Sequence, residues 1–280
     1  KSPTGGGLVA GAGYYNSGEK ATLVVKNSPG YTFSGHTGDV DGGFSADNPL
    51  EFNVDANKAI SVKKAPGKLN SLVLSLNGAN PVGTIGIGHT RWATHGIPNE
   101  ANSHPHQDCQ GNVVVVHNGI VENYRELKQE LLNSGHTFSS VTDSEVIPHL
   151  IESLMSDGMS SEEATRQTAL RLVGAHAVVV IFSGEPEKLL AFRNGNAGGL
   201  VVGYGYGEML LASDLPAIIP ITQRIAFLSA GEMLSLTPTT ASYSSIQGTT
   251  IDKKPQVVPY DPVSVAKGGY KHFMLKEISE

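Results

Sequence analysis

The sequence is poor in several features that would point to particular classes of protein. Its 280 residues include a single cysteine, Cys109, which excludes an internal disulfide framework and any multi-cysteine zinc or iron–sulfur site. The 20 basic residues are outnumbered by 26 acidic ones and form no block, so a nucleic-acid or anionic-membrane surface is not expected. No apolar run approaches the roughly 18 residues of a membrane-spanning helix.

The start of the chain also lacks expected features. It begins at Lys1 and not at Met, and its first residues contain no apolar signal-peptide core. We therefore expect a processed or partial chain. What the composition does offer is 33 glycines and 15 prolines with few charged residues, which is typical of a folded, turn-rich protein.

The first 62 residues differ from the rest in composition and in the spacing of their apolar residues. Glycine is enriched there, and short alternating segments at residues 20–26, 31–34 and 50–54 are separated by turn signals such as Ser-Pro-Gly and Asp-Gly-Gly. These features predict a small all-β module over residues 1–62, ahead of a second domain over residues 63–280. The stretches GAGYYNSGEKATLVV and NPLEFNVDANKAISV resemble extracellular bacterial β-repeats of the internalin B-repeat kind. That resemblance implies a surface spacer without catalytic residues.

From residue 63 onward the spacing of apolar residues alternates between helical and strand-like. A strand is expected at residues 112–117, buried on both faces because it holds four consecutive valines. Helices are expected at residues 67–76, 123–133, 144–155 and 160–173, and further strands at residues 84–89, 175–182, 188–193, 200–202, 208–212, 224–228 and 232–236. Helices followed by a run of antiparallel strands predict an α+β layered domain. No Gly-x-Gly-x-x-Gly motif supports a dinucleotide site.

A histidine-rich segment is the first candidate for chemistry, and one interpretation of it is a metal site. His104, His106 and Asp108 have the H-x-H-x-D spacing of zinc hydrolases, in which the ion activates a water. However, the motif here runs into a turn that feeds a strand, whereas that class places it between a strand and a helix. Hydrogen-bonded loop histidines are therefore the better default, because a three-residue match is weak.

The other interpretation is a site for an amino acid. Arg91, Thr94 and His95 place a guanidinium, a hydroxyl and an imidazole within five residues, a group suited to a carboxylate. Asn118 and Gly119 follow the buried strand, where two N–H donors can point at one developing oxyanion.

Asp143 precedes a predicted helix and has two interpretations. It can cap that helix, or its carboxylate can pair with a substrate ammonium. Together with the guanidinium and the oxyanion donors, the second role describes a pocket for an amino acid with a carbonyl in its side chain.

Longer motifs carry a family resemblance. The segments IGHTRWATHGIPNEANSHPHQD, VVVVHNGIVENYRELKQEL and SVTDSEVIPHLI, with LASDLPAII and the closing YKHFMLKEI, resemble class II glutamine amidotransferases, in particular the glutaminase domains of glutamine–fructose-6-phosphate aminotransferases. The resemblance runs from about residue 63 to residue 280. It implies an N-terminal-nucleophile hydrolase fold, a four-layer αββα sandwich that here lacks its first strands.

The resemblance also implies an activity and partners. Glutamine is hydrolysed and its ammonia channelled to sugar-isomerase domains, which would make glucosamine 6-phosphate. L-glutamine is the implied ligand, and no cofactor or metal is implied. The resemblance implies a cytoplasmic location, whereas the β-module alone would imply a location outside the cell. A homodimer is a further option. The implied roles are α-carboxylate binding by Arg91, Thr94 and His95, ammonium binding by Asp143, an oxyanion hole of Asn118 and Gly119, channel gating by Trp92, and a structural or interface role for His104.

The sequence departs from the family at the nucleophile. The family uses a cysteine at the mature N-terminus, in a Cys-Gly-Ile start, with its own α-amine as the base. This chain starts at Lys1 and has no such segment, and Cys109 lies within the chain without a free amine, so a surface thiol is expected there. The sequence also stops at Glu280 without the isomerase domains. We therefore expect no glutamine hydrolysis by this chain.

Three hypotheses stay open. The first is a glutaminase portion whose N-terminus was lost or wrongly joined. The second is a genuine fusion, in which a non-catalytic glutamine-binding or surface module follows the β-repeat. The third is the zinc hydrolase that uses His104, His106 and Asp108.

Overall fold

The computed structural model describes the chain in segments. These are residues 7–10, 20–27, 36–37, 44–45, 50–53, 60–67, 69–77, 83–90, 97 and 99–259. Before residue 60 only the backbone course is described. There, β1 (Gly7–Ala10), β2 (Lys20–Asn27) and β5 (Leu50–Asn53) form an antiparallel sheet in the order β1-β2-β5, and β3 (His36–Thr37) pairs with β4 (Phe44–Ser45). Strands predicted at residues 20–26 and 50–54 are thereby confirmed, while residues 31–34 lie outside the described residues.

A seven-stranded antiparallel sheet forms the centre of the second region. Its strand order is β15-β14-β13-β9-β8-β7-β6. The strands are β6 (His106–Gln107), β7 (Val113–Gly119), β8 (His176–Phe182), β9 (Leu189–Asn194), β13 (Glu232–Leu236), β14 (Ala241–Ser245) and β15 (Thr250–Ile251). Because β7, β8 and β9 are neighbours over their full lengths, their side chains alternate between the two faces in step.

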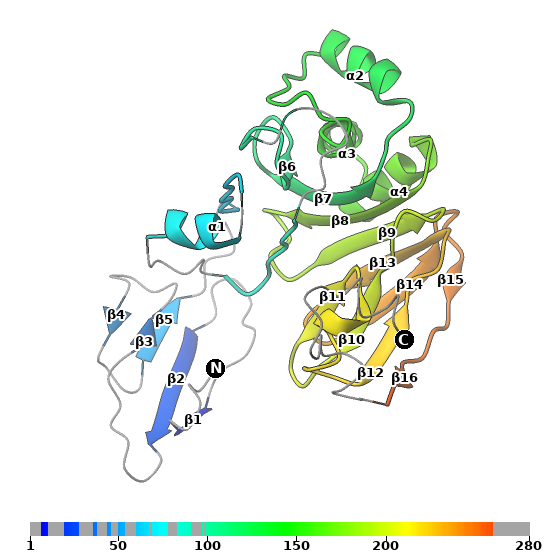
Figure 1. The fold of residues 1–280 in the computed structure, drawn as a ribbon. Helices are drawn as coiled ribbons and strands as arrows, with labels where there is room; N and C mark the ends of the chain where they lie inside the picture. Colours follow the sequence, from blue (N-terminus) through cyan, green and yellow to red (C-terminus); the bar gives the residue numbers. More distant parts are fainter. Residues whose placement is uncertain are drawn as a thin grey trace, which may run out of the picture.

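Helices cover one face of this sheet (Figure 1). They are α2 (Tyr124–Asn133), α3 (Val146–Ser156) and α4 (Ser161–Arg171), whereas the short α1 (Leu69–Ser75) lies earlier in the chain. Ser160 caps α4, since its hydroxyl accepts from the backbone N–H of Glu163 at 3.2 Å.

A second, smaller sheet packs on the other face. It has the order β11-β10-β12-β16, and comprises β10 (Val201–Tyr204), β11 (Met209–Ala212), β12 (Arg224–Phe227) and β16 (Gln256–Val257). Its buried Val202, Ala226 and Leu228 meet the central sheet. On the outer side, the 3-10 turn η1 (Leu215–Ala217) leads into Ile218, which packs on Val201 and Ile225.

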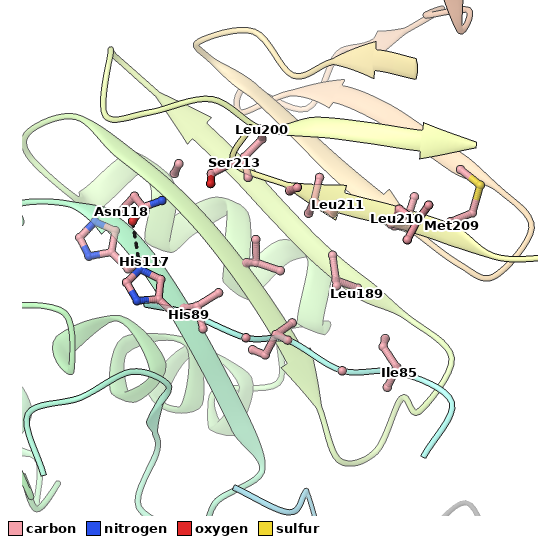
Figure 2. Close-up of a pocket in the computed structure, with 18 of the residues that line it drawn as sticks. Ile85, His89, His117, Asn118, Leu189, Leu200, Met209, Leu210, Leu211 and Ser213 are labelled. Atoms are coloured by element: carbon pink, nitrogen blue, oxygen red, sulfur yellow. Dashed lines mark hydrogen bonds between the residues drawn. The ribbon is translucent and has the colours of Figure 1, made fainter. Parts of the chain in front are cut away.

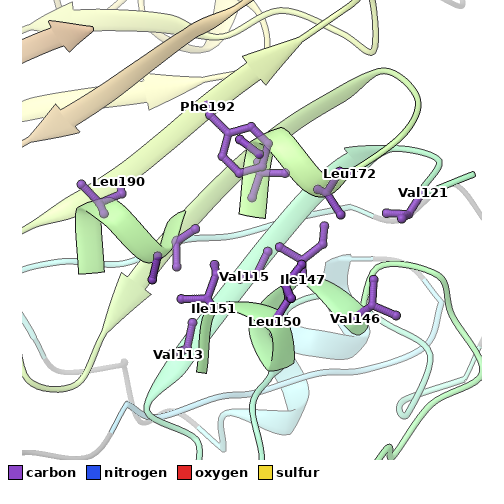
Figure 3. Close-up of a cluster of buried hydrophobic side chains, with 14 of the residues drawn as sticks. Val113, Val115, Val121, Val146, Ile147, Leu150, Ile151, Leu172, Leu190 and Phe192 are labelled. Carbon is purple, nitrogen blue, oxygen red and sulfur yellow. The ribbon is translucent and has the colours of Figure 1, made fainter. Parts of the chain in front are cut away.

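The four consecutive valines of β7 show why the layers stack in this way. Val113 and Val115 join the core under the helices, with Ile147 and Leu150 of α3 (Figure 3). Val114 and Val116 point the other way, into the core between the two sheets. Burial on both faces, as predicted, therefore places β7 inside the layered structure.

The predicted α+β layered class is confirmed by these helix and sheet layers. Residues 84–89 differ from expectation, because no described strand pairs with them. They still run through the core between the sheets, where Ile85 and Ile87 pack. Strands β14, β15 and β16 were not predicted; the first of these reads Ala-Ser-Tyr-Ser-Ser and carries little apolar signal. None of the helices in the described segments combines the length and apolar character needed to cross a bilayer.

Candidate functional site

A cavity of about 720 Å³ lies between the two stacked sheets. Leu189 of β9, Leu211 of β11 and Ile85 contribute to walls that are largely apolar (Figure 2). At one end the lining becomes polar, where His117 and Asn118 meet His89. A mostly apolar enclosure with a few convergent polar groups is typical of a small-molecule site.

Asn118 is the best-placed polar group in the cavity. It is the penultimate residue of β7, opposite Ala177 in the ladder, so its backbone is fixed by the β7–β8 pairing. The Nε2–H of His89 donates to Oδ1 of Asn118 at 2.9 Å. Because the amide oxygen is thus engaged, the Asn118 NH2 is the group that can donate to a ligand.

Gly119 closes β7 in a conformation that only glycine adopts easily. Its φ is +135°, and a Cβ at this position would lie 2.1 Å from the carbonyl oxygen of Ala175. Glycine therefore lets the backbone end the strand at Gly119, which still pairs with His176 of β8.

His117 is held between two partners beneath the site. Its Nδ1 lies 2.8 Å from the hydroxyl oxygen of Ser144, and its Nε2 lies 3.1 Å from Nδ1 of His176. Burial, together with the neighbouring imidazoles of His176, His89 and His106, holds the pKa of His117 well below its ordinary value. A neutral His117 therefore connects the end of β7 to the segment that precedes α3.

Asp143 lies in that same segment and is buried. Its Oδ2 accepts from the backbone N–H of Val121 at 2.8 Å, two residues beyond Gly119. Helix α3 begins at Val146 with Glu145 as its N-cap residue, so Asp143 is not the cap that one of its interpretations assumed. The carboxylate instead ties the start of α3 to the end of β7.

The structure brings some of the predicted site residues together. Asn118 lines the cavity, whereas Gly119 and Asp143 adjoin that end without being part of the lining. Arg91, Trp92, Thr94 and His95 lie outside the described residues. The roles assigned to all seven stay predictions.

Two residues at the cavity were missed as site residues. His89 and His117 lie within the motifs that carry the family resemblance, but neither received a role. The available signal was their position: His117 directly precedes Asn118, and His89 ends the predicted strand before Arg91.

The zinc-hydrolase alternative gains no support from the geometry. His106 Nε2 lies 3.1 Å from the hydroxyl of Thr142, and Asp108 Oδ1 accepts from the backbone N–H of Val113 at 3.1 Å. Within the described part of the chain, His104, His106 and Asp108 do not gather their ligand atoms around one point. The His104 ring instead lies between those of His89 and His106, with centroid separations of 4.2 Å and 4.8 Å.

Comparison with known proteins finds two domain families in the chain. Residues 89–220 match the glutamine amidotransferase domain, and residues 1–63 match the divergent InlB B-repeat domain. Glutamine–fructose-6-phosphate aminotransferase [isomerizing] of Pyrococcus horikoshii is 48% identical over 222 residues, covering 79% of this chain and 37% of the relative. The protein of the same name from Aquifex aeolicus is 48% identical over 219 residues, covering 78% of this chain and 36% of the relative.

A solved structure is also similar. Glutamine phosphoribosylpyrophosphate amidotransferase from B. subtilis, complexed with ADP and GMP, aligns with a TM-score of 0.46 and 24% identity, over 56% of this chain and 34% of that one. The chain spans less than two fifths of the length of the two curated relatives. Over residues 89–220 the chain is therefore similar to glutamine amidotransferase domains, as its motifs predict, and ahead of that region residues 1–63 are similar to divergent InlB B-repeat domains.

Proposed function

We propose that the cavity between the two sheets binds L-glutamine, with the side-chain amide of the ligand at the Asn118 end. The observation that carries the proposal is the hydrogen bond from His89 to Asn118 Oδ1 at 2.9 Å. This bond orients the Asn118 NH2 as a donor at the polar end of the cavity. A glutamine side-chain carbonyl is an acceptor that suits this donor.

The other roles follow from the chemistry of the ligand. The α-carboxylate of glutamine is proposed to bind Arg91, Thr94 and His95, and its ammonium the Asp143 carboxylate. The Asn118 NH2 and the Gly119 N–H then form an oxyanion hole, and Trp92 gates the path by which ammonia leaves. Removing one donor from such a hole costs about 2.7–4 kcal/mol of transition-state stabilisation in other enzymes.

Turnover needs a nucleophile beside the amide carbon of glutamine. Cys109 supplies the only thiol in these 280 residues, and it is not among the residues that line the cavity. We therefore propose that this chain binds glutamine without hydrolysing it.

Transfer of nitrogen to fructose 6-phosphate, the reaction in the relatives' name, is proposed only for a protein that also carries sugar-isomerase domains. We place the domain boundary near residues 62–63 and the glutamine-binding part in the cytoplasm; a homodimer is compatible with both.

The match of residues 1–63 to a divergent InlB B-repeat domain favours a second candidate. In this candidate the glutamine-binding region serves as a non-catalytic module on the cell surface. Locating the protein by immunolabelling of intact cells distinguishes the two, because only a surface module is labelled without permeabilisation.

Calorimetric titration of the purified chain with L-glutamine tests the proposal. We expect saturable binding that weakens at least tenfold in Arg91→Ala, because a hydrogen bond to a charged group contributes about 1.5–3 kcal/mol. Asn112→Ala, a matched change at the opposite end of β7, should leave the affinity unchanged. Absence of binding, or equal affinity in Arg91→Ala, contradicts the proposal.

A glutaminase assay on the same samples addresses turnover. We expect no release of ammonia above background. Release that disappears in Asn118→Ala would show that the chain is catalytic and would overturn the proposal of binding without hydrolysis.

A further inference from the structure

Four side chains of metal-binding type meet on the helical side of the molecule. Cys109 comes from the turn between β6 and β7, and His136 from the loop after α2, while His149 and Glu152 lie one turn apart on α3. One ligand atom from each lies within 4.8 Å of the other three. None of the four lines the cavity between the sheets, so this cluster is separate from the proposed glutamine site.

Four of the six separations between these atoms are close to those of a tetrahedral site. Cys109 Sγ lies 3.6 Å from Nδ1 of His136 and 3.5 Å from Nδ1 of His149. Glu152 Oε2 lies 3.0 Å from Nδ1 of His136 and 3.5 Å from Nδ1 of His149.

Tetrahedral zinc has Zn–S bonds of about 2.3 Å and Zn–N or Zn–O bonds of about 2.0–2.2 Å, which place S and N about 3.5 Å apart and N and O about 3.3 Å apart. Four of the six edges of the cluster are therefore within about 0.3 Å of those of a zinc tetrahedron, and all six are within 4.8 Å, so small side-chain movements suffice to surround one ion.

We propose that Cys109, His136, His149 and Glu152 bind one structural zinc ion. A thiolate with two imidazoles suits zinc, whereas magnesium and calcium prefer oxygen ligands alone. Four protein ligands leave no open position for a reacting water, which is the arrangement of structural sites. On binding, the Cys109 thiol loses its proton to solvent and its sulfur forms the S–Zn bond; His136 and His149 coordinate through Nδ1 and Glu152 through a carboxylate oxygen, with no change of oxidation state.

Groups around the cluster already hold its ligands in place. Nε2 of His149, the ring nitrogen that faces away from the cluster, lies 3.9 Å from Oε1 of Glu145. That carboxylate is itself fixed by the backbone N–H groups of Ser139 and Ser140, each at 2.7 Å. The Glu145 carboxylate is thus on the side of His149 from which a carboxylate can orient a metal-binding ring, although 3.9 Å is longer than a hydrogen bond.

The sulfur is supported as well. The backbone N–H of Thr137 donates to Cys109 Sγ at 3.5 Å. Cys109 is exposed, as expected of a surface thiol, and its sulfur also lies within reach of His136, His149 and Thr137.

The proposed ion joins three segments of the fold. It ties the β6–β7 turn and the α2–α3 loop to helix α3. Because the unfolded chain does not hold these ligands together, bound zinc stabilises the folded state by mass action. We expect the melting temperature to rise by roughly 5 °C with zinc in excess and to fall again on chelation.

Metal analysis of the full 280-residue chain tests this proposal. After loading with zinc and desalting, we expect about one zinc per chain in the unchanged protein and in the control Glu126→Gln, an exposed change on α2. Cys109→Ser and Glu152→Gln should each lose most of the zinc. His149→Ala is less informative, because His149 is 1% exposed and its loss also disturbs packing.

Cobalt substitution supplies a second readout that does not depend on stability. Co²⁺ bound to the unchanged protein should give a thiolate-to-cobalt charge-transfer band that is absent in Cys109→Ser. Zinc well below one per chain, equal zinc content in Cys109→Ser, or cobalt binding without that band would each overturn the proposal. In those cases the His136–Glu152 contact is an ordinary ion pair.

Discussion

The two faces of the central sheet are built by alternate residues of the same strands, yet one face packs into a closed core and the other borders a cavity. On the helical face, Val115, Phe192 and Leu150 belong to a core with its largest side chains fully enclosed. On the other face, Val116 and Leu189 border a cavity of about 720 Å³ with a polar end. Because side chains alternate along a strand, one set of strands can hold a rigid core and a binding space back to back.

The largest effect should come from a matched pair of leucine truncations on the two faces. Leu150→Ala removes a 1%-exposed side chain from the helical core and should cost about 4 kcal/mol, since it opens a closed void. Leu189→Ala enlarges a space that already exists and should cost about 2 kcal/mol. Urea denaturation measures both, and equal losses would show that the two faces are packed alike.

The helical face could be predicted almost entirely from the sequence. Helices α2, α3 and α4 agree with their expected positions to within a few residues, because their apolar residues recur at helical spacing. The valine run of β7 correctly indicated a strand buried on both faces.

The cavity face was predictable only in part. Asn118 was found because it ends that strand, but the cavity walls come from β9, β11 and residues 84–90, which are far apart in the sequence. The sequence did not predict strand β16 of the small sheet, because β16 spans only Gln256–Val257 and has no periodic pattern. The tertiary contact between Cys109 and α3 left no local signal either.

Gly119 offers a sharper test at the boundary between the two faces. Gly119→Ala meets the Ala175 carbonyl oxygen at 2.1 Å in a strained backbone conformation and should cost about 3 kcal/mol. Gly135→Ala shares a positive φ but has nothing within 4 Å of the added Cβ, so about 1 kcal/mol is expected. Thermal unfolding of the two variants separates the clash from the backbone strain, and similar melting temperatures would show that the segment just before β8 moves at Ala175 to make room.

Acid should weaken the polar end of the cavity face before it affects carboxylates. Burial lowers the pKa of His117 well below 6.5, and the pKa of His176 is lowered for the same reason. The unfolded chain therefore binds more protons below pH 6.5, and stability falls as the pH drops, by at most about 1.4 kcal/mol per pH unit for each histidine.

Denaturation midpoints between pH 6.5 and pH 5 report on this effect. This range lies above 4.5, the ordinary pKa of Glu145. Burial alone would raise that pKa, but the nearby His149 side chain and the hydrogen bonds from Ser140 and Ser139 hold it below its ordinary value. Stability from that carboxylate is present above pH 4.5 and is lost only at lower pH. His117→Gln should flatten the slope, and an unchanged slope would assign the effect to other groups.

The smallest expected effect concerns how the two sheets are held together beside the cavity. The hydroxyls of Tyr204 on β10 and Tyr243 on β14 are 2.8 Å apart, a direct polar link between the sheets. Burial first, and then the Tyr204 hydroxyl, raise the pKa of Tyr243 above its ordinary value, so the Tyr243 hydroxyl stays protonated. Tyr204→Phe should cost about 1 kcal/mol, because it leaves the Tyr243 hydroxyl without this partner.

Tyr206→Phe is the matched control, since Tyr206 is fully exposed. The double change Tyr204→Phe with Tyr243→Phe should cost less than the sum of the single changes, because two apolar rings leave no unsatisfied hydroxyl. Strictly additive costs in urea denaturation would mean that the link does not couple the sheets. In that case apolar packing alone would hold the two sheets together around the cavity. The two faces of the central sheet would then differ only in packing density, with a closed core on one face and a cavity on the other.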